Sequence, residues 1–348
     1  MKKLIKLTLA SVLSLTALVG CGSSGAKNTL KVYNWGEYVD TDVISAFEKE
    51  FDCDVVYETF DSNETMYTKL LGGNQYDVMV PSEYMIERLI KENLLQKVDW
   101  SLITNKDSLD NSVLNQSFDQ NNEYWVPYFY GNVGIVYDKT QVDEKDLSAG
   151  WEVLRNTKYK GNVYMYDSER DSFMVALKAL GFSMNTTNTD EIKKAYDWLI
   201  DQRATMNPTY AADDSIDAMK NSEKAMAVMY SGDAAAVMAE NEDMGFYMPN
   251  EGTNYWFDGF VISKDCTNAT LAMEFINFMI NDENSYLNTQ EVGYYTTNTV
   301  AAKKASEEDF KGINAYGIRM GANDEVFAYQ EQSIKEIYSD YWTKVKAQ

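Results

Sequence analysis

Aromatic and acidic side chains are concentrated in five short segments that follow predicted strands, and one of these, 167–171, holds acids but no aromatic ring. The segments are 35–38, 82–84, 167–171, 230–233 and 255–258. Tryptophan and tyrosine rings attract a cation to their faces, and each good contact contributes roughly 0.5–2 kcal/mol. Carboxylates supply the counter-charge that an ammonium group needs when it leaves water, because an unpaired buried charge is very costly. This combination suits a flexible polycation whose ammonium groups are joined by methylenes.

The candidate side chains for such a site are five rings and two carboxylates: Trp35, Tyr38, Tyr84, Trp256, Tyr294, Asp171 and Asp258. Each one has a simpler explanation by itself. A single tryptophan usually packs in a core, and an aspartate after a strand usually caps a helix or turn. Their co-occurrence in short loops favours binding, although the pattern alone leaves a sugar or an amino acid as the ligand.

Strand-like and helix-like segments alternate along the chain, which favours α/β layers with a largely parallel sheet. The first cycle has predicted strands at 30–33, 54–57 and 76–80 and predicted helices at 43–51, 65–71 and 85–92. A long extended segment at 126–137 then has enough strand character to cross between two lobes. The later predicted elements are helices near 151–154, 174–180, 191–200, 271–281 and 330–346 and strands at 163–165, 225–230 and 259–262. Open α/β sheets bind ligands at the carboxyl ends of their strands, where the aromatic and acidic segments fall.

The composition excludes several kinds of chemistry. The 348 residues hold no histidine, which removes the commonest general base and the usual imidazole metal ligand. Lysine and arginine number 31 against 54 acidic residues, a net charge of −23 that argues against nucleic acid and anionic lipid headgroups as partners. We therefore expect no catalytic residue, no cofactor and no metal site. Cys53 and Cys266 are either buried thiols or one disulfide, and their spacing does not decide between the two.

The amino-terminal residues are typical of a secretory signal. Lys2, Lys3 and Lys6 precede a mostly apolar stretch at 7–19, which is too short to span a bilayer comfortably as a helix. The residues before Cys21 resemble the bacterial lipobox. We predict a signal peptide at 1–20, lipidation of Cys21 and a flexible tether at 21–28. The alternative is an ordinary signal peptide with a chance cysteine.

Several motifs occur in an order that matches one known family. They are YNWGEYV at 33–39, SNETMY at 62–67, YDVMVPSEY at 76–84, YKG at 159–161, and segments at 252–259, 293–298 and 337–346. With these motifs the chain resembles the spermidine/putrescine-binding proteins of bacterial ABC importers over nearly its whole mature length. The resemblance implies a two-lobed, periplasmic-binding-protein-like α/β fold. Each lobe would be a mixed sheet flanked by helices, with the ligand cleft between the lobes.

The resemblance also implies roles for single residues. The rings expected to stack on the ligand are Trp35, Tyr38, Trp256 and Tyr294. Ser82 and Tyr84 would line the site, and Asp258 would bind an amine. Tyr230 stands where the best-known members carry tryptophan, and it keeps a stacking face.

Segment 167–171 departs from the family pattern, as Tyr230 does. Asp171 aligns with an expected glutamate, but the second expected acid falls on Ser168, so Asp167 and Glu169 are both candidates as well. A late glutamine of the family corresponds to Gln330 or Gln332. The carboxylate of the first loop, Glu37, is also a candidate contact.

The expected lobes are 29–131 with 259–303 for lobe 1 and 132–258 with 304–348 for lobe 2. The resemblance implies a monomeric, extracytoplasmic binding protein that is no enzyme. Its partners would be a polyamine ligand, the permease subunits of an ABC importer and, through the lipid anchor, the membrane.

Two alternatives remain. An extracellular glycoside hydrolase also uses aromatic walls and paired carboxylates. A binding protein for another solute, such as thiamine or ferric iron, is the second. Tyr294 and Tyr295 make iron worth stating, since iron needs tyrosine and acid oxygens that converge on one point.

Overall fold

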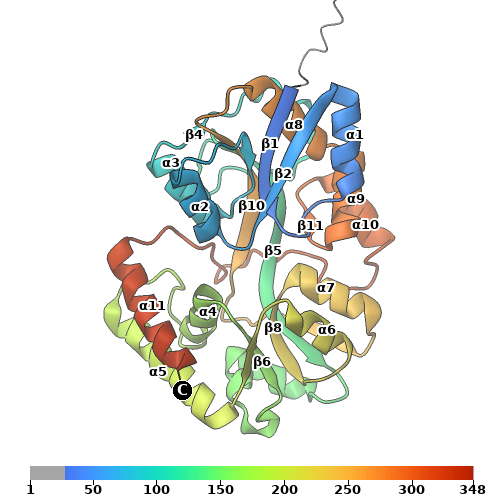
Figure 1. The fold of residues 1–348 in the computed structure, drawn as a ribbon. Helices are drawn as coiled ribbons and strands as arrows, with labels where there is room; N and C mark the ends of the chain where they lie inside the picture. The colour runs from blue at the N-terminus through green and yellow to red at the C-terminus, as the bar shows by residue number, and fades with distance from the viewer. Residues whose placement is uncertain (1–27, 348) are drawn as a thin grey trace, which may run out of the picture.

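The computed structural model describes residues 28–347 and shows two lobes of sheet and helix, one above the other in Figure 1. The predicted signal peptide, Cys21 and nearly all of the predicted tether lie outside the described residues. Within this described part of the chain, no helix has the length and apolar character that a membrane span requires.

Among residues 28–347, eleven strands form the sheet system. They are β1 (Asn28–Trp35), β2 (Cys53–Phe60), β3 (Val78–Met79), β4 (Leu95–Gln96), β5 (Trp125–Asp138), β6 (Val163–Tyr166), β7 (Thr209–Ala211), β8 (Met226–Tyr230), β9 (Met244–Tyr247), β10 (Tyr255–Ser263) and β11 (Tyr295–Thr296).

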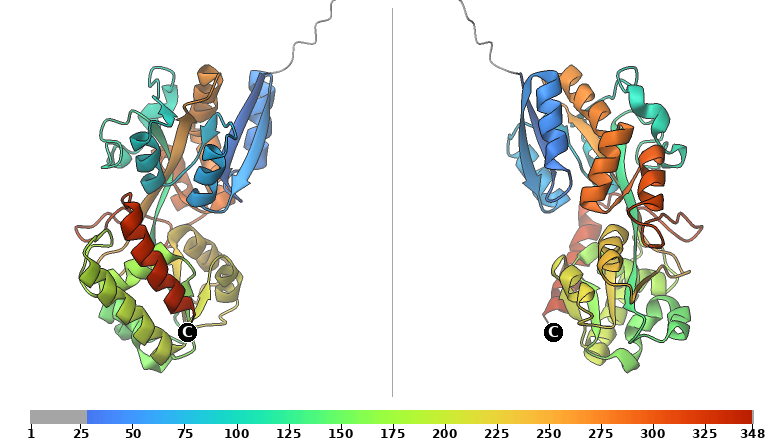
Figure 2. Two further views of the ribbon diagram at one scale, coloured as in Figure 1. Left: turned by 60° about the vertical axis from the view of Figure 1, so that its left-hand side comes forward. Right: turned by 90° about the vertical axis from the view of Figure 1, so that its right-hand side faces the viewer.

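Helices cover the strands in both lobes (Figures 1 and 2). The α-helices are α1 (Thr41–Phe51), α2 (Asn63–Leu71), α3 (Glu83–Lys91), α4 (Glu169–Ala179), α5 (Thr189–Met206), α6 (Asp214–Lys220), α7 (Ser231–Glu240), α8 (Ala269–Met279), α9 (Asp282–Val292), α10 (Thr299–Glu307) and α11 (Gln332–Lys346). Short 3-10 helices are η1 (Thr104–Ser108), η2 (Asn111–Val113), η3 (Glu144–Arg155) and η4 (Thr157–Tyr159).

Strand β5 joins the two lobes, as Figure 1 shows. Its first half pairs with β10 and β11, and its second half pairs with β8 and β9. The strand order through the molecule is β2-β1-β3-β10-β5-β8-β6-β7. The segment predicted to cross between lobes is therefore the central strand of the fold.

The sheet is mixed, as the resemblance implied. The alternation of strands and helices suggested a largely parallel sheet, and that expectation is wrong. Strands β2, β1 and β3 are parallel in the upper lobe, and β8, β6 and β7 are parallel in the lower lobe. Strand β5 leaves the upper lobe and β10 returns to it, so these two strands run in opposite directions. Only the parallel strands carry the crossover helices that produced the alternating pattern.

One predicted helix takes a different form. The segment near 151–154 belongs to the 3-10 element η3, which is kinked at Gly150. Gly150 has a φ of 64°, which interrupts a helix and favours glycine. The predicted carboxyl-terminal helix is α11, and Figure 2 shows it beside α5 on the outside of the lower lobe, where Tyr196 stacks on Tyr341 at 4.5 Å.

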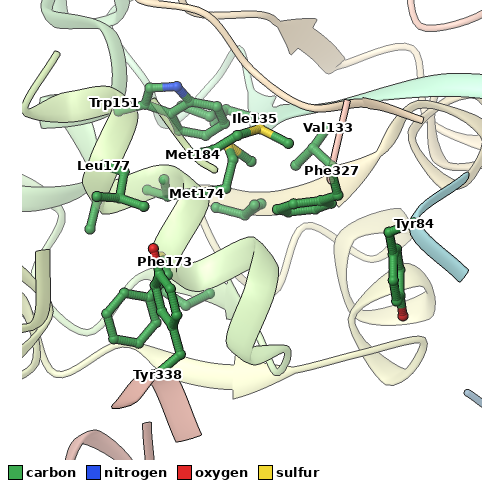
Figure 3. Packing of buried hydrophobic residues seen from close by; sticks show 14 of the residues in the cluster. Tyr84, Val133, Ile135, Trp151, Phe173, Met174, Leu177, Met184, Phe327 and Tyr338 are labelled. Carbon is green, nitrogen blue, oxygen red and sulfur yellow. The ribbon is translucent and has the colours of Figure 1, made fainter. Parts of the chain in front are cut away.

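A buried apolar cluster anchors the lower lobe beneath the site. Figure 3 shows Phe173 of α4 beside Tyr338, with ring centroids 4.9 Å apart, and Tyr84 at the edge of the group. The packing of α4 against this core fixes the position of its first turn. Cys53 and Cys266 are both buried, and no disulfide joins them.

Candidate ligand-binding site

Four aromatic side chains from separate segments form a continuous row. Tyr38 lies after β1, Tyr294 before β11, Trp256 on β10 and Tyr230 at the end of β8. The ring centroids are 5.6 Å apart for Tyr38 and Tyr294, 5.1 Å for Tyr294 and Trp256, and 6.0 Å for Trp256 and Tyr230. All three contacts are edge-on, so each ring braces its neighbour. We call these four rings the aromatic row.

Asp258 lies at the Tyr38 end of the aromatic row. The Tyr38 hydroxyl donates to Oδ2 of Asp258 at 2.6 Å, and the carboxylate is 6% exposed. Its Oδ1 is buried and has no hydrogen-bond partner among residues 28–347. A buried carboxylate with one unsatisfied oxygen favours a hydrogen-bond donor, and an ammonium group best of all.

A β-bulge sets the direction of Asp258. The register between β10 and β5 shifts between Asp258 and Gly259, which makes Tyr128 of β5 an extra residue. The Tyr128 hydroxyl donates to the backbone oxygen of Tyr38 at 3.1 Å and so holds the first loop against the bulge. Bulges commonly re-aim side chains beside binding sites. The bulge therefore places a carboxylate and its tyrosine partner together, although they are 220 residues apart in sequence.

Glu83 supports the same strand from lobe 1. Its Oε2 accepts the backbone N–H of Phe257 at 3.0 Å, between Trp256 and Asp258, and the residue is 1% exposed. Burial raises the pKa of Glu83 to about 8, against the opposing effect of the Phe257 hydrogen bond. Glu83 is therefore a structural acid that orients β10.

Asp171 lies at the Tyr230 end of the aromatic row. The Tyr230 hydroxyl donates to Oδ2 of Asp171 at 3.0 Å, while Oδ1 is buried and unpartnered within the described chain. Burial raises the pKa of Asp171, and the hydrogen bonds from Ser168 and Tyr230 oppose this rise. Both ends of the row thus carry a buried carboxylate with one unsatisfied oxygen.

Asp233 is a third acid at the row, and the sequence argument missed it as a candidate. It lies in the first turn of α7, and its Oδ1 accepts the Tyr294 hydroxyl at 2.9 Å. Burial raises the pKa of Asp233 to about 7. The adjacent Gly232 is needed here, because a Cβ at that position would overlap the Tyr294 ring. The sequence does carry a signal for Asp233, because segment 230–233 combines an aromatic residue with an acid.

Four of the five polar residues of segment 167–171 have separate surroundings. Ser168 is the N-cap of α4, and its Oγ accepts the N–H of Asp171 at 3.4 Å. Asp167 is exposed and forms an ion pair with Lys346 at 2.5 Å, away from the aromatic row. Glu169 is partly buried beside Phe327, and burial raises its pKa. Of the three candidate acids in this segment, the structure brings only Asp171 to the row.

Ser82 is the N-cap of α3, and Tyr84 lies in the first turn of that helix. The amide nitrogen of Asn63 donates to Ser82 Oγ at 3.1 Å and to the Tyr84 hydroxyl at 3.0 Å. Asn63 is 3% exposed, and the sequence argument quoted it in a motif without assigning it a role. Ser82 also forms an isolated β-bridge with Asp258, which joins this loop to the end of the row.

The remaining candidates lie beside the row or away from it. Trp35 packs on Phe60 at 4.5 Å at the carboxyl end of β1. Glu37 is exposed, in a turn with a φ of 48°. Gln330 is 9% exposed and borders the same small hollow as Glu169, whereas Gln332 begins α11 on the surface.

Comparison with known proteins fits this geometry. A model of the bacterial extracellular solute-binding proteins matches residues 42–315. The chain belongs to this family. Membership makes it a solute-binding protein and no enzyme, which excludes the glycoside hydrolase alternative.

Relatives of this solute-binding protein cover almost its whole length. A spermidine/putrescine-binding periplasmic protein of Escherichia coli strain K12 is 33% identical over 92% of each chain. A structure described as a spermidine/putrescine ABC transporter from Listeria monocytogenes is 34% identical, covers 92% of this chain and 99% of its own, and has a TM-score of 0.81. A lipoprotein of Treponema pallidum is 25% identical over 92% of this chain and 100% of its own, with a TM-score of 0.79.

The two neighbouring tyrosines of this solute-binding protein do not converge on one point. Tyr294 belongs to the aromatic row, whereas Tyr295 packs on Tyr130 at 5.4 Å and on Tyr316 at 4.9 Å. Residues 28–347 also contain no group of three or more acidic or cysteine side chains that could hold a metal ion. This arrangement does not suit ferric iron.

Proposed function

We propose that this solute-binding protein captures a polyamine, spermidine or putrescine, and delivers it to the permease of an ABC importer. The observation that carries the proposal is the aromatic row with a buried, half-satisfied carboxylate at each end. A diamine or triamine presents ammonium groups to such carboxylates and methylenes to the ring faces. The names of the relatives support the same class of ligand.

The proposed ligand contacts are residues of the row and its surroundings: Trp35, Tyr38, Ser82, Tyr84, Asp171, Tyr230, Asp233, Trp256, Asp258 and Tyr294. Glu169 and Gln330 border one small hollow, and both stay predicted ligand contacts. Glu37 is exposed and Asp167 pairs with Lys346, and neither is part of this proposal.

Lobe closure is the proposed mechanism of capture. The row draws residues from both sides of the crossover, since Tyr38 belongs to lobe 1 and Tyr230 to lobe 2. We propose that the lobes are 29–131 with 259–303 and 132–258 with 304–348, and that they rotate about β5 and β10. A ligand that bridges them would shift the population toward the closed form, which would then dock on the permease.

Calorimetry with putrescine, spermidine and a neutral disaccharide tests the proposed function. We expect heat of binding with at least one polyamine and none with the sugar, because only the cations compensate the buried carboxylates. One site per chain would agree with the proposed monomer. No heat with either polyamine at millimolar concentration would refute the proposal.

The proposed location is the outer face of the cell membrane or the periplasmic space, with the protein anchored through a lipidated Cys21. The lipobox-like sequence supports this, and the Treponema relative is described as a lipoprotein. A Cys21→Ser form is expected to move from the membrane fraction to the soluble fraction of expressing cells. Equal membrane retention of both forms would contradict the anchor.

A further inference from the structure

An arginine from lobe 2 stacks on a site tyrosine of lobe 1. The guanidinium carbon of Arg170, in the first turn of α4, lies 3.8 Å from the ring centroid of Tyr84. The same carbon lies 5.3 Å from the ring centroid of Phe327. Nη1 of Arg170 is buried and has no hydrogen-bond partner in the part of the chain that the structure describes. A cation of the protein therefore covers one face of Tyr84, a ring that the family resemblance places at the lining of the site.

Arg170 belongs to the electrostatic field of the site. It immediately precedes Asp171, and its positive charge acts to lower the pKa of Asp171, Glu83 and Tyr84. Of the other charges near it, Glu64 is exposed and screened by solvent, whereas Glu169 and Lys335 are partly buried and opposite in sign. The charge that a ligand meets at this end of the row is therefore set by Asp171 and Arg170 together.

With its three carboxylates ionised, the row together with the adjacent Arg170 carries a net charge equal in size and opposite in sign to that of a diamine. Asp171, Asp233 and Asp258 supply three carboxylates, and Arg170 supplies one positive charge, which leaves two negative charges. Glu83 is not counted, because its carboxyl group is committed to the backbone N–H of Phe257. Putrescine carries two ammonium groups, whereas spermidine carries three amines that are all charged at neutral pH.

We infer that Arg170 is a specificity-determining residue that makes the site prefer a diamine over a longer triamine. This inference rests on the proposed function. A diamine spans the row and leaves the Arg170–Tyr84 stack in place. The third ammonium of a triamine meets Arg170 in one of two ways. It approaches the guanidinium, and the two positive charges repel each other because little solvent screens them, or it displaces the guanidinium from the Tyr84 ring. Either event weakens triamine binding and leaves diamine binding unaffected.

Substitution of Arg170 separates this role from simple bracing of the lobes. The affinities of putrescine and spermidine are measured by calorimetry for the full protein and for Arg170→Gln, Arg170→Lys and Arg88→Gln. Arg88 is the matched control, because its guanidinium carbon lies 3.6 Å from the Tyr67 ring, outside the row. The Lys variant keeps the charge and loses the planar stack. Thermal unfolding of each variant identifies any that fails to fold.

The expected result is that the unchanged protein binds putrescine more tightly than spermidine. Arg170→Gln should shift the ratio of the two affinities toward spermidine by at least about tenfold, since a third carboxylate charge is then uncompensated. Arg170→Lys should retain most of the putrescine preference, and Arg88→Gln should leave the ratio unchanged. An equal loss for both ligands in Arg170→Gln would overturn the inference and make Arg170 a brace between the lobes. An original preference for spermidine would also overturn it, whereas failure of both polyamines to bind would refute the proposed function instead.

Discussion

Asp258→Asn is expected to weaken polyamine binding at least tenfold. Removing one partner of a desolvated charge pair costs about 2–5 kcal/mol, and about 1.4 kcal/mol corresponds to a tenfold change. Asparagine keeps an oxygen that can accept from Tyr38, so the row stays assembled while the counter-charge is lost. The expected loss is therefore one of ligand affinity and not of fold. Calorimetry with putrescine and spermidine measures it.

Asp265→Asn is the control for this substitution. Asp265 follows the same strand but is exposed, two residues beyond the end of β10. The substitution removes one acidic charge without touching the row, so any general effect of net charge appears in both variants. Unchanged affinity in Asp258→Asn, or an equal loss in both variants, would remove Asp258 from the binding site.

Polyamine binding is expected to weaken steeply as the pH falls from 8 to 5. Burial raises the pKa of Asp258 to about 6 and that of Asp233 to about 7 in the free protein. An ammonium ligand favours the ionised carboxylates, so affinity falls about tenfold per pH unit below each pKa. Asp258 contributes about tenfold and Asp233 about a hundredfold over this range. The ligand itself stays protonated, because alkyl amines titrate near pH 10.

The stability of the free protein changes with pH in the opposite direction. An unfolded aspartate has a pKa of about 3.9, and both folded pKa values are higher. The folded state therefore binds more protons between about pH 4 and 7, and the contribution of these groups to stability is lost as the pH rises through that window. The rise in melting temperature caused by putrescine should grow from pH 5 to pH 8. A rise that is independent of pH would contradict the assignment of these two acids to the ligand.

Local sequence pattern was sufficient for most of the elements. The apolar spacing of Val43, Ile44 and Phe47 predicted α1, and all three are buried on one face. The strand character of 126–137 predicted the crossing strand β5. Pattern failed at η3, where the left-handed Gly150 interrupts a segment of helical spacing. It also failed for the direction of β10, because strand direction depends on which lobe the chain enters next.

The candidate site was predicted unevenly. Tyr38, Trp256 and Asp258 could be named because their types and order match a family. Asp233 could not be separated from an ordinary helix-cap residue, since only its contact with Tyr294 distinguishes the two. Segment 167–171 offered three acids, and their directions follow from the capping of α4 by Ser168, which local sequence does not reveal.

The sequence by itself determined the chemistry of this protein: an excess of acids, rings in short loops, no histidine and an order of motifs that identifies a family. The tertiary structure alone decided which of these groups meet. Asp258 bonds Tyr38, Asp171 bonds Tyr230, and Arg170 covers Tyr84. These pairs are distant in sequence or lie in different lobes, and each depends on a bulge, a helix cap or the packing of one lobe on the other. Residue type sets what a side chain can bind, whereas its direction and neighbours are properties of the whole packed chain.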